Sequence, residues 1–87
     1  QLPVYIMKKD KVELNEMDVE PIFEKILKKY SSEKIDRTDG IKIVFHDAWI
    51  HFRKSNTEPV VRIIAEARSK AQLDKLLSTF TSYFHRV

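Results

Sequence analysis

Apolar residues early in the chain recur with the spacing of an α-helix. Between residues 19 and 30 they fall at i, i+3, i+4, i+7, i+8 and i+11, which is one stripe of a 3.6-residue repeat. The stripe consists of Val19, Ile22, Phe23, Ile26, Leu27 and Tyr30. Asp18 occupies the expected N-cap position, and Pro21 is tolerated because N–H groups of the first turn have no intrahelical acceptor. The pattern predicts a helix that ends before Ser31-Ser32.

The middle of the chain alternates apolar and polar residues with the two-residue period of strands. Four runs show this pattern: residues 35–38, 41–45, 48–53 and 60–67. Asp39-Gly40 separates the first two runs and predicts a two-residue hairpin with a type I′ turn, because that turn requires positive φ angles. His46-Asp47 predicts the next tight turn.

A second helix is predicted after the last strand. Ser69 and Gln72 have the spacing of a capping box. Apolar residues then continue at helical spacing: Leu73, Leu76, Leu77, Phe80, Phe84 and Val87. Two one-sided helices and about four strands predict an α+β fold, in which a mainly antiparallel sheet carries both helices on one face. The other face, which presents Trp49, His51 and Arg53, is expected to be more open.

The start of the chain carries a weaker pattern. Residues 2–7 are mostly apolar, whereas lysines and Asp10 precede Val12 and Leu14. We interpret residues 1–14 as a lead-in strand or linker that enters from a preceding domain. Since the sequence contains no repeat or low-complexity tract, residues 1–87 are expected to form a single domain.

Composition narrows the classes of function. The 87 residues are 43% hydrophobic and 33% charged, as in a globular domain. No apolar run approaches the roughly 20 residues of a membrane span, and Gln1-Leu2-Pro3 does not resemble a signal peptide. The absence of cysteine excludes disulfides and thiolate chemistry, and Gly40 alone cannot build a glycine-rich nucleotide loop. The net charge of +3 gives a mild preference for anionic partners.

The segment that packing explains least is the loop between the last two predicted strands. Residues 53–59 read Arg-Lys-Ser-Asn-Thr-Glu-Pro, and Arg62 follows. Arginine presents a planar fork of donors that matches two phosphate oxygens, while hydroxyl, amide and turn N–H groups add short donors. A solvated turn is an open alternative, because Ser, Asn and Pro also form turns for purely local reasons.

The three histidines match no metal-binding spacing, so no metal site is expected in this chain. We interpret His46 as a turn residue and His85 as a helix-end residue. His51 shares a strand face with Arg53 and is a candidate for lining a binding cleft. Trp49 is interpreted as a packing residue rather than a platform for a sugar.

The loop and its flanking strands resemble the C-terminal domain of the α-D-phosphohexomutases, which are the phosphoglucosamine, phosphomannose and phosphoglucose mutases. The family pattern is Arg, one variable residue, Ser, Gly or Asn, Thr, Glu or Thr, and Pro, and residues 53–59 match it. Glu66-Ala67, Asp39-Gly40-Ile41 and Leu2-Pro3-x-Tyr5 match as well. The resemblance therefore covers nearly the whole chain.

The resemblance implies a TATA-box-binding-protein-like domain that closes over an active-site cleft and holds the phosphate at the non-reacting end of the sugar. The family's phosphate-binding positions are taken by Arg53, Ser55, Asn56, Thr57 and, less closely, Arg62. Glu58 and Pro59 are expected to shape the loop rather than to contact the ligand.

The resemblance also implies a parent enzyme that interconverts hexose or hexosamine 1-phosphates and 6-phosphates through a bisphosphorylated intermediate. Its implied partners are hexose phosphates, hexose bisphosphates and the parent's other domains, one of which binds Mg²⁺, and its implied location is cytoplasmic. The family's phosphoserine, metal and sugar loops have no counterpart in this sequence. The chain is therefore expected to contain no catalytic residue and to be inactive by itself.

Two alternatives from other classes remain open. A small nucleic-acid-binding module is supported by an isoelectric point of about 9.2 and by the open sheet face. However, Lys25, Lys28 and Lys29 lack an accompanying aromatic platform and indicate a solvated helix face. A protein-interaction domain, in which the charged loop is merely a turn, is the other alternative. Neither nucleic acid nor a membrane is an expected partner.

Overall fold

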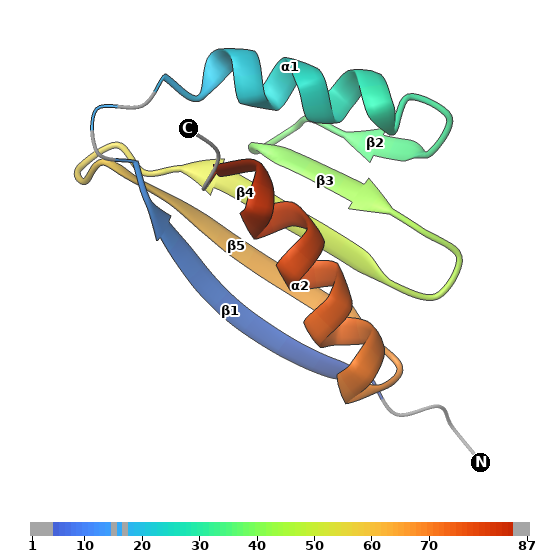
Figure 1. Cartoon of the computed structure of the whole chain (residues 1–87). Helices are drawn as coiled ribbons and strands as arrows, with labels where there is room; N and C mark the ends of the chain where they lie inside the picture. Colours follow the sequence, from blue (N-terminus) through green and yellow to red (C-terminus); the bar gives the residue numbers. More distant parts are fainter. Residues whose placement is uncertain (1–4, 15, 17, 85–87) are drawn as a thin grey trace.

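The computed structural model describes residues 5–14, 16 and 18–84, and within these residues five strands form one antiparallel sheet in the order β1-β5-β4-β3-β2. The two helices of this part of the chain lie against one face of the sheet (Figure 1). The elements are β1 (Ile6–Glu13), α1 (Glu20–Lys29), β2 (Lys34–Asp36), β3 (Ile41–Val44), β4 (Trp49–Lys54), β5 (Val60–Ala67) and α2 (Lys70–Phe84). The predicted α+β class, with an antiparallel sheet and two helices, is confirmed.

The sheet has five strands where about four were expected, and the additional strand is β1. It pairs with β5 along its whole length, from Ile6 opposite Ala67 to Glu13 opposite Val60. Of its residues only Val12 is buried, and lysines fill much of the rest, so apolar alternation barely marks it. Lysines are typical of edge strands because they oppose pairing with another chain. The lead-in segment thus contributes the edge strand beside β5.

The hairpin between β2 and β3 differs from the prediction. The loop spans residues 37–40, and the last pair of the ladder is Asp36 opposite Lys42. Gly40 has a φ of +74° but Asp39 does not have a positive φ, so the predicted two-residue type I′ turn is wrong. The Asp36 carboxylate accepts a hydrogen bond from the Thr38 N–H at 2.9 Å and starts the turn early.

The next hairpin agrees with the prediction. The Phe45 N–H donates to the Ala48 carbonyl at 2.8 Å, which leaves His46-Asp47 as its two-residue turn. His46 is exposed in that turn, as expected.

Both helices begin close to their predicted starts. The N-cap of α1 is Val19, one position after the predicted Asp18, and the Asp18 carboxylate accepts the Glu20 N–H at 3.1 Å. Before α2, the Ser69 hydroxyl accepts the Gln72 N–H at 3.1 Å, as a capping box requires. His85 and Val87, predicted at the end of this helix, lie outside the described residues.

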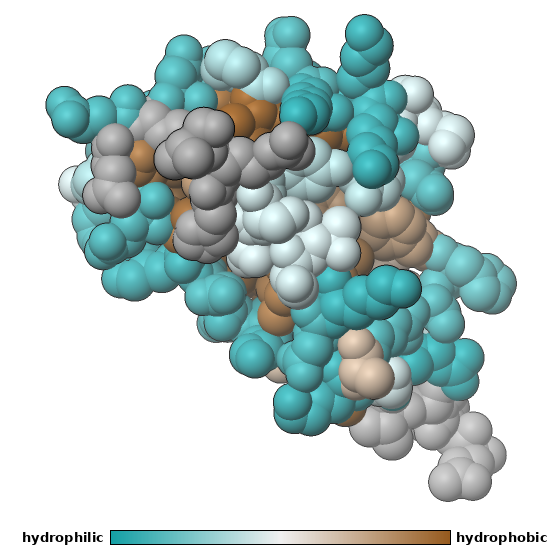
Figure 2. All heavy atoms as spheres, in the orientation of Figure 1, coloured by the Kyte–Doolittle hydropathy of each residue, from teal (hydrophilic) through white to brown (hydrophobic). Residues whose placement is uncertain are grey.

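Phe52 stands at the centre of the core, on the face of β4 that the helices cover. Its ring centroid lies 5.5 Å from that of Phe23 on α1, and 6.0 and 6.3 Å from those of Phe80 and Phe84 on α2. The predicted apolar faces are confirmed by the buried residues of the three central strands: Ile41, Ile43, Ile50, Phe52, Val61, Ile63, Ala65 and Ala67. Seen from the helix side, the surface is largely hydrophilic, with hydrophobic residues visible in several places (Figure 2).

The opposite face of β4 is more open, as predicted. Trp49 and His51 are half-buried there, and Arg53 is exposed. Because the core fixes the backbone of β4 from the other side, these three side chains extend from a rigid support. In the described part of the chain, neither helix is long and apolar enough to cross a membrane.

Candidate phosphate-binding loop

The loop between β4 and β5 is folded around the hydroxyl of Ser55. This oxygen accepts the N–H groups of Thr57 at 3.2 Å and Glu58 at 3.3 Å, and it lies 3.4 Å from the Thr57 hydroxyl. The Ser55 N–H donates to the Val60 carbonyl at 2.9 Å and closes the base of the loop. Asn56 and Thr57 are exposed at its tip. Ser55 therefore shapes the turn, and the side chains beside it remain accessible to a ligand.

The end of β1 holds the exit of this loop. The N–H of Leu14, a buried residue, donates to the Pro59 carbonyl at 2.8 Å. This contact was not predicted, since residues 1–14 were interpreted as a lead-in strand or linker without a pairing partner. The alternation of Val12 and Leu14 was the available signal for a strand that ends beside the loop.

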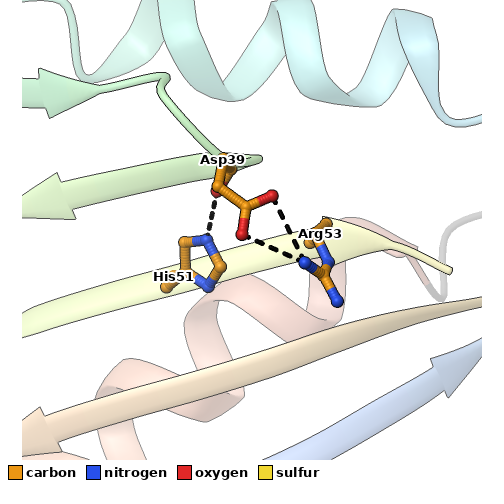
Figure 3. Close-up of polar contacts among 3 residues, drawn as sticks. All are labelled: Asp39, His51 and Arg53. Carbon is orange, nitrogen blue, oxygen red and sulfur yellow. Dashed lines mark hydrogen bonds and ion pairs between the residues drawn. The ribbon is translucent and has the colours of Figure 1, made fainter.

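Arg53 forms an ion pair with Asp39 from the β2–β3 loop (Figure 3). Its Nη1 atom donates to the Asp39 carboxylate, at 3.0 Å from Oδ2 and 3.3 Å from Oδ1. The side chains are 53% and 66% exposed, so water and small solutes reach both. Asp39 was predicted as a turn residue and as part of the family-matching Asp39-Gly40-Ile41, without a contact to Arg53. Sequence alone could not pair it with Arg53, because the contact depends on where the loop lies across β4.

His51 lies beside this ion pair on the same face of β4. Its Nε2 atom is hydrogen-bonded to the backbone carbonyl of Asp39, as Figure 3 shows. Two positions separate His51 from Arg53 along the strand, so their side chains are neighbours on that face. The structure thus places the candidate cleft-lining histidine next to the candidate phosphate ligand, with its Nε2 engaged by the loop.

Arg62 lies directly opposite Arg53 on the neighbouring strand β5. Residues opposite each other in an antiparallel pair have Cβ atoms about 5 Å apart, and like charges at such positions are destabilising. Each arginine faces a carboxylate, since Arg62 Nη2 lies 3.6 Å from Glu58 Oε1 and Arg53 contacts Asp39. Two exposed arginine side chains therefore start from directly opposite positions at the base of the loop, and guanidinium groups can hold the oxygens of a tetrahedral anion.

In residues 5–14, 16 and 18–84, no group of three or more His, Cys, Asp or Glu side chains that could hold a metal ion comes together. Anion binding at the loop would depend on the guanidinium, hydroxyl and amide donors.

Comparison with known proteins identifies the family. The family model for the C-terminal domain of phosphoglucomutase/phosphomannomutase matches residues 6–81. The chain is 41% identical over 81 residues to a phosphoglucosamine/phosphogalactosamine mutase of Sulfurisphaera tokodaii. It is 40% identical over 79 residues to a phosphoglucomutase/phosphomannomutase of Thermococcus kodakarensis, and 35% identical over 80 residues to a probable phosphoglucosamine mutase of Pyrococcus horikoshii.

These alignments cover nearly all of this chain and a small part of each relative. They span 90%, 88% and 87% of the chain but only 18%, 17% and 18% of the respective mutases. The resemblance inferred from the sequence is thus confirmed from the start of β1 into α2, as far as residue 81. The chain belongs to the phosphoglucomutase/phosphomannomutase family, in which it corresponds to the C-terminal domain.

Proposed function

We propose that this domain binds the phosphate group at the non-reacting end of a hexose phosphate. The observation that carries the proposal is the position of Arg53 opposite Arg62 at the base of the Ser55–Thr57 loop, in a chain of this family. Both arginine side chains are about half exposed, and residues with hydroxyl and amide side chains follow Arg53 in the loop. This combination of charge and short donors matches a phosphate group.

The proposed phosphate-binding residues contribute different hydrogen-bond donors and charges. Arg53 supplies the planar fork that can hold two phosphate oxygens, and Arg62 adds a second positive charge. The side chains of Ser55, Asn56 and Thr57 offer hydroxyl and amide donors from the loop. Such contacts recognise a phosphate rather than a particular sugar hydroxyl.

We further propose that the parent protein is a phosphohexomutase that interconverts hexose or hexosamine 1-phosphates and 6-phosphates through a bisphosphorylated intermediate. In such a reaction the intermediate must present each of its two phosphates in turn to the reacting group. The site that holds the non-reacting phosphate must then accept the phosphate at either end of the intermediate. A site that contacts only the phosphate group can do so. Positioning of this kind is a large part of catalysis in phosphoryl transfer.

This chain itself carries out no chemical step in the proposed reaction. The parent's phosphoryl transfer, and the Mg²⁺ expected to assist it, belong to residues outside these 87. We therefore expect the isolated domain to show no mutase activity.

The direct test is an amide NMR titration of the 87-residue chain. Glucose 6-phosphate and inorganic phosphate should bind with a dissociation constant on the order of 1 mM, because one charge-assisted site supplies only about 4 kcal/mol. Shifts should concentrate on residues 53–57 and 62, and uncharged glucose should cause none. Shifts produced by a short oligonucleotide over Lys25, Lys28 and Lys29, with none from phosphate, would instead favour the nucleic-acid alternative.

Lys54 offers a matched control for Arg53. The two residues are adjacent and exposed, but Lys54 pairs with the buried Val61 and so belongs to the other face of the sheet. Arg53→Ala should abolish measurable phosphate binding, whereas Lys54→Ala should change the affinity less than twofold. Equal losses in the two variants would mean that net charge alone, rather than a built site, attracts the anion.

A further inference from the structure

The β2–β3 loop contacts the phosphate-binding region through both the side chain and the backbone of one residue. The Asp39 carboxylate accepts from Arg53 Nη1, and the Asp39 carbonyl contacts His51 Nε2 (Figure 3). Both carboxylate contacts end on a single nitrogen of the guanidinium. A guanidinium carries five N–H donors on three nitrogens. Because Asp39 contacts Nη1 alone, the donors on the Nε–Nη2 edge are not used by Asp39.

The distance between this loop and β4 is set by a glycine. A Cβ atom at Gly40 would lie 2.7 Å from the Phe52 carbonyl oxygen and 3.0 Å from the Arg53 Cβ atom. Gly40 also has a φ of +74°, a conformation that other residues adopt only with strain. Only glycine at this position lets the loop approach closely enough for Asp39 to reach Arg53.

The loop is also held from within. Hydrogen bonds from the side chain and backbone of Thr38 keep the pKa of the Asp36 carboxyl below its ordinary value. The Asp36 carboxylate is charged at neutral pH, as an aspartate ordinarily is, and it fixes the turn by accepting the Thr38 N–H.

We infer that Asp39 is a positioning residue for Arg53. It anchors Nη1 so that the Nε–Nη2 edge of the guanidinium is presented to a phosphate group, an inference that rests on the proposed phosphate-binding function. An exposed ion pair of this kind contributes little to stability, so its effect is expected in binding rather than in folding.

Asp39 also exerts an opposing electrostatic effect. Its negative charge stands close to the site of a bound anion and disfavours binding, while its hydrogen bonds orient Arg53 and favour binding. The two effects can be separated with two variants that both lack the negative charge of Asp39, only one of which keeps a side-chain oxygen that can accept from Arg53. Asp39→Asn keeps an oxygen that can accept from Nη1, whereas Asp39→Ala keeps none.

The experiment measures the dissociation constant of inorganic phosphate for the 87-residue chain and for these two variants by NMR titration. Asp39→Ala should bind phosphate roughly 3- to 10-fold more weakly than Asp39→Asn, the effect of one lost orienting hydrogen bond. The resonance of the Arg53 Nε–H should broaden or shift in Asp39→Ala before phosphate is added and should be preserved in Asp39→Asn. Equal affinities in the two neutral variants, or tighter binding by Asp39→Ala, would overturn the positioning role.

Arg53→Ala, measured in the same series, distinguishes a failure of the positioning role of Asp39 from a failure of the proposed phosphate-binding function. If Arg53→Ala eliminates phosphate binding while the two Asp39 variants are equal, the loop binds phosphate without the help of Asp39. If Arg53→Ala binds as well as the unaltered chain, the proposed function fails, and the role of Asp39 fails with it. Thermal melts of all variants establish that each is folded at the temperature of the titration.

Discussion

The two faces of β4 use alternate residues of one six-residue strand for different purposes. On the covered face, Ile50 and Phe52 are completely buried among side chains of both helices. On the open face, Trp49, His51 and Arg53 make polar contacts with neighbouring strands and with the β2–β3 loop. Packing accounts for both of these buried residues. It does not account for Arg53, which lies opposite a second arginine.

The two faces therefore differ in what their side chains contribute. On the covered face, burial of apolar area stabilises the fold and is opposed mainly by the loss of conformational entropy. Arg53 and Arg62 are like charges at opposite positions, an arrangement that is generally unfavourable, and each forms an ion pair with an exposed carboxylate. A phosphate bound beside them would be attracted by both positive charges.

The largest expected change in stability is on the covered face, at Phe52. Phe52→Ala removes an aromatic ring that contacts Phe23, Phe80 and Phe84 and leaves a cavity. The free energy of unfolding should fall by about 3–5 kcal/mol. His51→Ala, one residue away on the open face, is the matched control and should cost about 1 kcal/mol or less. Denaturant unfolding measures both, and equal losses would show that the two faces contribute alike to stability.

Much of the fold could be predicted because the central strands alternate strictly. Ile41, Ile43, Ile50 and Phe52 are all buried, as their period of two predicts. β1 was harder to predict because an edge strand with exposed lysines has little apolar pattern. The type I′ turn was wrong because hydrogen bonding from Thr38 to the Asp36 side chain competes with backbone pairing.

The candidate site could be predicted only in part. Its loop is continuous in sequence, so the residues from Arg53 to Thr57 could be recognised together. The contact between Asp39 and Arg53 joins residues 14 positions apart through the register of β3 and β4. No local pattern encodes that register. The hydrogen bond from Leu14 to Pro59 depends in the same way on a pairing that the sequence marks weakly.

The next effect concerns Arg53 in a full-length mutase that contains this domain. Arg53→Ala should lower kcat/KM roughly 10- to 100-fold, which corresponds to about 1.4–2.7 kcal/mol of lost transition-state binding. Arg53→Lys should also impair the enzyme, because lysine keeps the charge but loses the planar fork. Steady-state kinetics and a thermal melt on the same variants provide the measurement.

Stability should hardly change in either Arg53 variant, since the side chain is 53% exposed and its ion pair is solvated. This is the opposite of the expectation for Phe52. Unchanged kinetics together with a clearly lowered melting temperature would make Arg53 a structural residue. The division of β4 into a packing face and a binding face would then no longer hold.

The smallest expected effect concerns Trp49, and it tests whether this residue of the open face stabilises the sheet or belongs to the phosphate-binding surface. The Trp49 Nε1–H donates to Glu66 Oε1 at 3.0 Å, and the Lys42 Nζ atom lies 4.5 Å from the centre of the Trp49 ring. These contacts satisfy Trp49 within the protein, so we expect it to stabilise the sheet without taking part in phosphate binding. Trp49→Phe should lower the free energy of unfolding by about 0.5–1.5 kcal/mol, mainly through the lost hydrogen bond, and leave the phosphate dissociation constant unchanged. Glu66→Gln, which keeps an acceptor for the indole, should be closer to the unaltered chain in both measurements. A weaker phosphate affinity in Trp49→Phe would instead extend the binding surface along β4 from Arg53 through His51 to Trp49.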